Sequence, residues 1–90
     1  MDNMEWSEYL GAMPWHKAKA YAENLGMRLP TVKELKSAYE AGITKEWEED
    51  GHWYWTSEEY SAERAYNFYI VNGLSYYDLK VFNVHVRCIR

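Results

Sequence analysis

The spacing of apolar residues predicts two short helices in the first half of the chain. The first helix carries an apolar stripe at intervals of three, four and three residues, made of Trp15, Ala18, Ala22 and Leu25. Pro14 suits the first position of this helix, because its missing N–H would have no partner there. Gly26 is typical of the position directly after a helix end, so we expect the helix to stop there.

A second helix is predicted after a short extended link. Pro30 favours an extended conformation for Leu29. Thr31 and Glu34 have the spacing of a capping box, in which each side chain accepts a hydrogen bond from the other residue's backbone N–H. The apolar face of the helix that follows consists of Leu35, Ala38 and Tyr39, and Gly42 is expected to end it.

The second half of the chain alternates as strands do. Residues 53–56 have strand character, and a weaker alternation at residues 4–7 indicates a short opening strand that Gly11 ends. Residues 65–71 form the strongest predicted strand, with Tyr66, Phe68 and Ile70 on one face and Asn67, Tyr69 and Val71 on the other. Residues 82–89 alternate again, with Val84, Val86 and Cys88 on one face and His85, Arg87 and Ile89 on the other.

The connections between these elements complete the prediction of an α+β fold. Residues 43–51 are polar and acidic and predict a loop, and residues 57–63 predict a polar connection. Asn72 and Gly73 predict a hairpin turn, because both residues tolerate positive φ. Ninety residues allow one modest core, so we expect a single domain over residues 1–90, with a strand, two helices and an antiparallel sheet.

Charge and hydropathy argue against two classes of partner. The net charge is −4, with ten scattered Lys and Arg residues against fourteen Asp and Glu, so the basic surface of a nucleic-acid-binding protein is not expected. No apolar run is long enough to insert into a membrane, and residues 1–5 do not have the pattern of a signal peptide. Neither a cytoplasmic nor an extracellular location follows from these observations.

Candidate catalytic and metal-binding groups are few. His16, His52 and His85 lack the spacing of a zinc site, and the adjacent pair Glu58-Glu59 would point to opposite faces of a strand. The acidic residues at positions 46, 48, 49 and 50 suit Ca²⁺ by ligand type but lack an EF-hand pattern. We therefore predict no catalytic residue, no metal site and no cofactor.

Four motifs in order resemble a known bacterial domain family. They are residues 15–22 (WHKAKAYA), 28–35 (RLPTVKEL), 54–57 (YWTS) and 86–90 (VRCIR). Together they resemble the domain at the C-terminus of the collagen-like adhesin Lcl, and residues 28–35 also resemble a stretch of formylglycine-generating enzymes. Both resemblances imply a C-type-lectin-like fold, in which two helices pack on a small twisted antiparallel sheet and the terminal strands lie close together.

The chain departs from these families at its cysteine and in its charge. In many members of the adhesin family a cysteine of the first helix can bridge to one in the closing strand, but Ala22 stands at the matching helix position and Cys88 has no partner. Formylglycine-generating activity needs reactive cysteines, so the resemblance does not extend to that activity. The net charge of −4 also disfavours an anionic polysaccharide as ligand.

The resemblance implies a binding module that meets its ligand through the loops and outer strands of the second half. Five Trp, nine Tyr and two Phe are more aromatic rings than a core of this size needs, and exposed Tyr and Trp suit protein or carbohydrate ligands. The predicted ligand-binding residues are Trp53, Tyr60, Asn72, Tyr76, Tyr77 and Asp78. Two alternatives remain open: Tyr76 and Tyr77 simply cover the hairpin, or the domain serves assembly, as a homo-oligomer within a larger bacterial surface protein.

Overall fold

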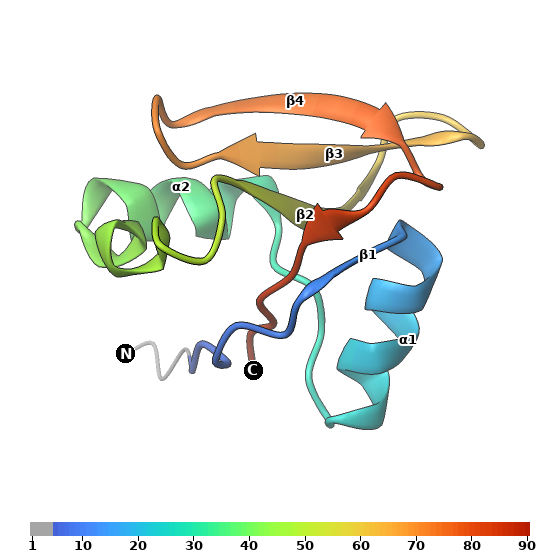
Figure 1. The fold of residues 1–90 in the computed structure, drawn as a ribbon, viewed down its shortest axis with the longest axis horizontal. Coiled ribbons are helices and arrows are strands. Elements are labelled where there is room, and N and C mark those ends of the chain that lie inside the picture. The colour runs from blue at the N-terminus through green and yellow to red at the C-terminus, as the bar shows by residue number, and fades with distance from the viewer. Residues whose placement is uncertain (1–4) are drawn as a thin grey trace.

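Two α-helices, one 3₁₀ helix and a five-stranded, mostly antiparallel sheet make up the computed structural model, which describes residues 5–90 (Figure 1). The helices are α1 (Trp15–Asn24), α2 (Val32–Glu40) and a 3₁₀ helix, η1 (Ile43–Trp47). The strands are β1 (Ala12–Met13), β2 (Trp53–Glu59), β3 (Arg64–Tyr69), β4 (Leu74–Leu79) and β5 (Val84–His85). They lie in the order β1-β5-β2-β3-β4.

Both predicted helices form, and local sequence explains their ends. Gly26 follows α1 with a φ of +70°, which a residue without a Cβ adopts without strain. At the start of α2 the capping box is complete: the Glu34 N–H donates to Thr31 Oγ1 at 3.1 Å, and the Thr31 N–H donates to Glu34 Oε1 at 2.9 Å. Leu25 is the exception in the α1 stripe, because it lies beyond the helix and remains exposed.

The sheet separates two hydrophobic clusters. Adjacent residues of a strand point to opposite faces; accordingly Trp55 belongs to the cluster under α1, and its neighbour Tyr54 to the cluster under α2. On β3, Ala65 likewise joins the α1 cluster and Phe68 the α2 cluster. The sheet thus lies between the two clusters. One of its edge strands, β4, lies beyond β3, away from the helices (Figure 1).

The ends of the described chain lie together, as the resemblance implied. Trp6 and Arg28 each form an isolated antiparallel bridge with Ile89. The Ser7 N–H donates to the carbonyl of Cys88 at 2.8 Å. Cys88 itself is fully buried in the α1 cluster, where it packs as a small apolar side chain.

The predicted loop at residues 43–51 was wrong. Its first part is the 3₁₀ helix η1, and Trp47 is buried in the α2 cluster. A single Trp among acidic residues gives no periodic signal. Trp47 nevertheless packs against Tyr54, with the two ring centroids 5.5 Å apart, and this contact holds the segment against the core.

Several strand boundaries also differ from the prediction. β2 runs on to Glu59, and β3 ends at Tyr69. Of residues 82–89 only Val84 and His85 form a strand. Ile89, expected on the face opposite Cys88, is fully buried like Cys88, because the segment leaves the sheet and Ile89 bridges Trp6 and Arg28 instead. The opening strand predicted for residues 4–7 reduces to the bridge at Trp6, and Met4 lies outside the described residues.

Candidate functional site

The six predicted ligand-binding residues do not form one surface. Tyr76 and Tyr77 are adjacent on β4, so their side chains point to opposite faces of the sheet. Tyr76 pairs with Asn67 of β3, and Tyr77 pairs with Tyr66. Two separate aromatic clusters follow, one on each face.

The first group, which we call the Trp53 cluster, consists of Trp53, Tyr69 and Tyr76. Trp53 stacks on Tyr69 with ring centroids 3.9 Å apart and an interplanar angle of 22°. Tyr76 meets Trp53 edge to face at 5.1 Å and Tyr69 at 6.2 Å. Each ring therefore restrains the other two, and Trp53 keeps 36% of its surface exposed.

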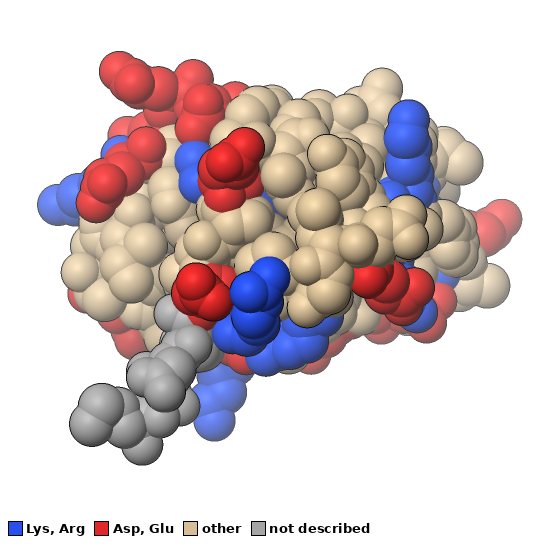
Figure 2. Space-filling view, turned by 90° about the horizontal axis from the view of Figure 1, so that it is seen from below, with Lys and Arg blue, Asp and Glu red and all other residues tan. Residues whose placement is uncertain are grey.

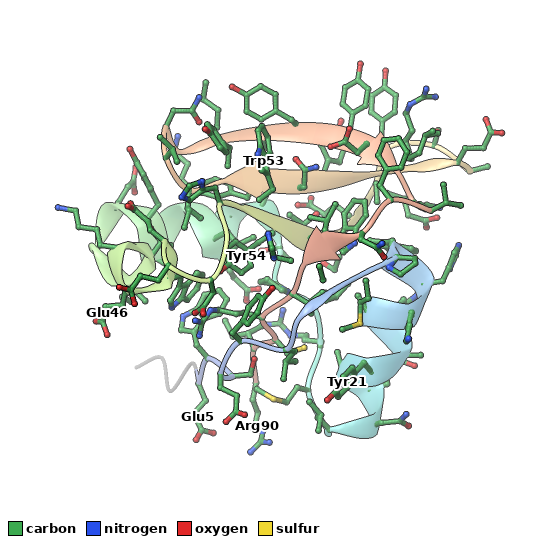
Figure 3. The ribbon with its side chains drawn as sticks, in the orientation of Figure 1. Glu5, Tyr21, Glu46, Trp53, Tyr54 and Arg90 are labelled. Atoms are coloured by element: carbon green, nitrogen blue, oxygen red, sulfur yellow. The ribbon has the colours of Figure 1, made fainter. Side chains whose placement is uncertain are left out.

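A hollow of about 370 Å³ opens beside Trp53. It is lined by Trp53, Asp78, Phe82, Asn83, Val84 and His85. The lining brings Trp53 of β2 together with the end of β4, the turn after it and β5, which are distant from Trp53 in the sequence. Figure 3 shows Trp53 and its neighbour Tyr54 on different sides of β2, so that Trp53 is left for this outer surface.

Hydrogen bonds hold the polar groups beside the hollow. The amide of Asn67, which is fully buried, donates from Nδ2 to Asp78 Oδ2 at 2.7 Å. Asn72 donates from Nδ2 to the hydroxyl oxygen of Tyr76 at 2.9 Å, and its Oδ1 accepts from the Leu74 N–H at 3.0 Å. Asp78 thus presents a carboxylate whose direction is fixed, and the Tyr76 hydroxyl keeps its own proton for a further bond.

His85 is held as part of the framework at the edge of the hollow. Its Nδ1 lies 2.7 Å from the hydroxyl of Tyr9, and Gly51 packs so closely that an added Cβ would lie 2.2 Å from the imidazole ring. Burial, and then the nearby His52, lower the pKa of His85. The lowered pKa favours the neutral ring, which shares a hydrogen bond with the Tyr9 hydroxyl.

The second group, which we call the Tyr60 cluster, lies on the other face of the sheet. Tyr60 and Tyr77 stack almost parallel, with centroids 3.8 Å apart and an interplanar angle of 4°. Tyr66 meets both edge to face, at 5.6 Å and 6.0 Å. The hydrogen bond and charge interaction with Tyr77 raise the pKa of Tyr60. Tyr60 and Tyr77 are half-exposed, and neither lines the hollow beside Trp53.

The arginines of the recognised motifs have structural partners. Arg28 donates to both carboxylate oxygens of Glu34, at 2.7 Å and 2.6 Å, and so steadies the start of α2. Arg87 binds Asp50 Oδ2 at 2.7 Å and lies 4.8 Å from the centre of the Trp47 ring. One acidic residue of the 43–51 segment is thereby committed to an ion pair.

The metal site and the reactive thiol considered from the sequence lack the necessary geometry among the described residues. Within residues 5–90, no three His, Cys, Asp or Glu side chains gather closely enough to hold a metal ion. A Ca²⁺ site of several carboxylates therefore does not fit this region, and Asp50 is already bound to Arg87. Burial raises the pKa of the Cys88 thiol to about 11, which keeps it protonated and unreactive.

The remaining surface has mixed character. Another hollow, of about 450 Å³, lies near the two ends of the described chain and includes Glu5, Tyr21 and Arg90 among its lining residues, on the far side of the molecule from Trp53 (Figure 3). In Figure 2, which views the molecule from below, uncharged side chains occupy the centre, and acidic side chains gather at the end where Figure 1 places α2 and η1. In the part of the chain that the structure covers, no helix is long and apolar enough to cross a membrane.

The element order, the two helices beside the twisted sheet and the adjacent chain ends define a C-type-lectin-like fold. The chain is similar to the structure of TC14, a C-type lectin from the tunicate Polyandrocarpa misakiensis, with a TM-score of 0.71 over 98% of each chain. The sequences are 16% identical, so this similarity concerns the fold. No family model and no curated protein matches the sequence.

Several residues that line the hollow are not among the predicted ligand-binding residues. These are Phe82, Asn83, Val84 and His85; Tyr69 does not line the hollow but stacks on Trp53. Of the predicted residues, Trp53 and Asp78 line the hollow, and Tyr76 and Asn72 support it. Tyr60 and Tyr77 belong to the opposite face, which strand alternation at Tyr76-Tyr77 could have indicated.

Proposed function

We propose that the chain is a non-enzymatic binding module that takes a carbohydrate, or a protein segment, in the hollow beside Trp53. The observation that carries the proposal is an exposed, immobilised indole next to a hollow with a fixed carboxylate. Trp53 is held by Tyr69 at 3.9 Å, and the carboxylate of Asp78 by Asn67 at 2.7 Å. A site whose groups are already ordered loses little entropy when it binds.

The chemistry of the hollow favours a neutral carbohydrate. A sugar ring has an apolar face that stacks on an aromatic ring and hydroxyls that donate to carboxylates. Asp78 provides an acceptor and Asn83 an amide within the same hollow. A volume of about 370 Å³ lies within the usual range for small-ligand sites. The similarity in fold to a C-type lectin agrees with this ligand class, although the missing Ca²⁺ ligands in the described region imply binding without a metal.

A titration of the ¹⁵N-labelled protein with a panel of neutral mono- and oligosaccharides tests this proposal. Binding in the hollow shifts the indole N–H signal of Trp53 and the amide signals of Asp78 and Asn83. The amide signal of Tyr21, on the far side of the molecule (Figure 3), stays in place and serves as the internal control. Shifts confined to residues around Tyr21 would contradict the proposed site.

The resemblance to the adhesin family and the free edge of β4 favour a second candidate function, self-association within a larger surface protein. Within residues 5–90, β4 has one neighbour in the sheet, β3. Sedimentation velocity over a concentration series tests this function, since a module that assembles sediments faster as concentration rises.

A further inference from the structure

β4 is an open edge of the sheet. Among the described residues, it pairs with β3 on one side and with no strand on the other. Three of its six residues are large, apolar and exposed: Leu74 at 53%, Tyr76 at 38% and Tyr77 at 46%. An open edge of this kind presents unpaired N–H and C=O groups to any extended chain.

The hydrogen-bond pattern identifies the groups that point outward. The Lys80 N–H donates to the Glu63 carbonyl at 2.9 Å, one pair beyond the last pair of the β3–β4 ladder, Arg64 with Leu79. Bonded and non-bonded pairs alternate in an antiparallel ladder, so residues 76 and 78 bond to β3, and at the start of β4 the Leu74 N–H donates to Asn72 Oδ1. The N–H and C=O groups of Ser75, Tyr77 and Leu79 therefore point away from the sheet.

The sequence of β4 does little to block pairing. Natural edge strands are commonly protected by Lys, Pro or a bulge, and β4 (LSYYDL) contains neither residue. Its register with β3 is continuous, whereas the irregularity in the sheet lies in β2, between Trp55 and Glu59. The one charged residue of β4, Asp78, points to one face of the sheet, where Asn67 binds its carboxylate. Its side chain therefore does not block the backbone groups of the edge.

We propose that β4 pairs antiparallel with β4 of a second copy of this chain, across a two-fold axis at Tyr77. The edge is self-complementary in the way an isologous dimer requires, because outward-pointing residues meet outward-pointing residues. The two five-stranded sheets then form one continuous sheet. The pairing does not depend on what the Trp53 hollow binds.

Side-chain chemistry selects the register. With Tyr77 on the axis, Tyr77 faces its own copy, and Tyr76 lies opposite Asp78 of the second copy, so a phenol meets a carboxylate. If one β4 strand is shifted along the other by two residues in one direction, Asp78 lies opposite Asp78 of the second copy. Like charges directly opposite each other destabilise a strand pair. Sliding in the other direction sets Asp78 opposite the apolar Leu74. Odd shifts set outward groups against groups already bonded to β3.

This arrangement places both Trp53 hollows on the same side of the joined sheet. A two-fold axis between two antiparallel strands of one sheet is perpendicular to that sheet, so each face continues into the same face of the second copy. Two equivalent sites on one face bind a repeating ligand more tightly than one site does. The dimer is thus a device for bivalent binding.

Sedimentation equilibrium of the full chain tests the association. We expect the average mass to rise from 10.8 kDa towards twice that value as the protein concentration approaches the order of 1 mM, a range in which weak pairing is populated. Ser75→Pro removes an outward N–H without touching a bond to β3, and Tyr77→Lys places a charge on the axis; both are expected to stay monomeric. Ser75→Ala is the matched control and is expected to dimerise. A strictly monomeric wild type, or a dimer that survives both variants, would overturn the proposal.

Cross-linking with an added oxidant tests the register. In a Cys88→Ala background, Tyr77→Cys is expected to form a disulfide-linked dimer, since both cysteines lie at the axis. Ser75→Cys is expected to remain monomeric, because its two copies are about 13 Å apart along the strands, well beyond disulfide reach. Equal cross-linking of both variants, or of Ser75→Cys alone, would contradict the register.

Discussion

Tyr76 and Tyr77 are consecutive residues of β4, yet Tyr76 packs against Trp53 at 5.1 Å and Tyr77 stacks on Tyr60 at 3.8 Å on the other face of the sheet. The two rings therefore serve different surfaces. Tyr76 supports the wall of the hollow, and Tyr77 lies on the axis of the proposed dimer. Substitutions at these neighbouring positions separate ligand binding from self-association.

Tyr76→Ala is expected to weaken ligand binding about tenfold, or about 1.4 kcal/mol, because Trp53 loses one of the two rings that hold it in place. Tyr77→Ala is expected to leave the affinity of a single hollow unchanged. Isothermal titration calorimetry at concentrations below dimer formation, with a saccharide found by NMR, measures both. Equal losses in the two variants would show that the two faces are not independent.

The sequence allowed the helices and the class of fold to be predicted, since their signals are local. Trp15, Ala18 and Ala22 repeat with the helical period, and Thr31 with Glu34 caps α2 within three residues. The hollow was not predictable in the same way. It needs Phe82, Asn83 and Val84 to lie beside Trp53, and nothing local to either segment records that β5 pairs with β2. The resemblance to the adhesin family and to formylglycine-generating enzymes predicted the fold correctly. A relation to either family remains a prediction.

Gly73→Ala is expected to destabilise the β3–β4 hairpin. Gly73 has a φ of +73°, and an added Cβ would lie 2.4 Å from the Tyr39 ring. Gly26→Ala is the matched control: its φ is +70°, but nothing lies within 4 Å of the added Cβ. Both variants carry the conformational cost of positive φ, about 1 kcal/mol, and Gly73→Ala carries an additional ~1–3 kcal/mol of overpacking. Urea denaturation measures both, and equal losses would contradict the close packing at Tyr39.

Glu34 is expected to make stability depend on pH in the acid range. The hydrogen bonds from Arg28, and then those within the capping box, lower its pKa against the opposing effect of burial. A carboxyl whose pKa is lower in the folded state stabilises the fold above its unfolded pKa, about 4.3, and this contribution disappears as the pH falls through the folded pKa. Glu34→Gln is expected to flatten the fall in melting temperature between about pH 5 and pH 3. An unchanged pH profile would contradict the role of Glu34.

Cys88 is expected to react with thiol reagents only when the protein unfolds. Its pKa of about 11 results from burial, so at pH 8 the folded protein has almost no thiolate. The unfolded chain ionises near pH 8.5, and the stability that this difference provides is therefore lost as pH rises from about 8.5 towards 11. Labelling at pH 8 in increasing urea follows the unfolding curve. Rapid labelling without urea would show that Cys88 is accessible.

The affinity of one saccharide for three proteins tests the central claim that the Trp53 hollow is the binding site. The proteins are the wild type, Trp53→Ala and Tyr21→Ala; Tyr21 is a matched control because it is 39% exposed against 36% for Trp53 and lies on the far side of the molecule (Figure 3). We predict that the wild type and Tyr21→Ala bind equally and that Trp53→Ala, still folded by circular dichroism, loses at least tenfold in affinity, about 1.4 kcal/mol. Equal binding by a folded Trp53→Ala, or no binding of any saccharide by the wild type, would contradict the account.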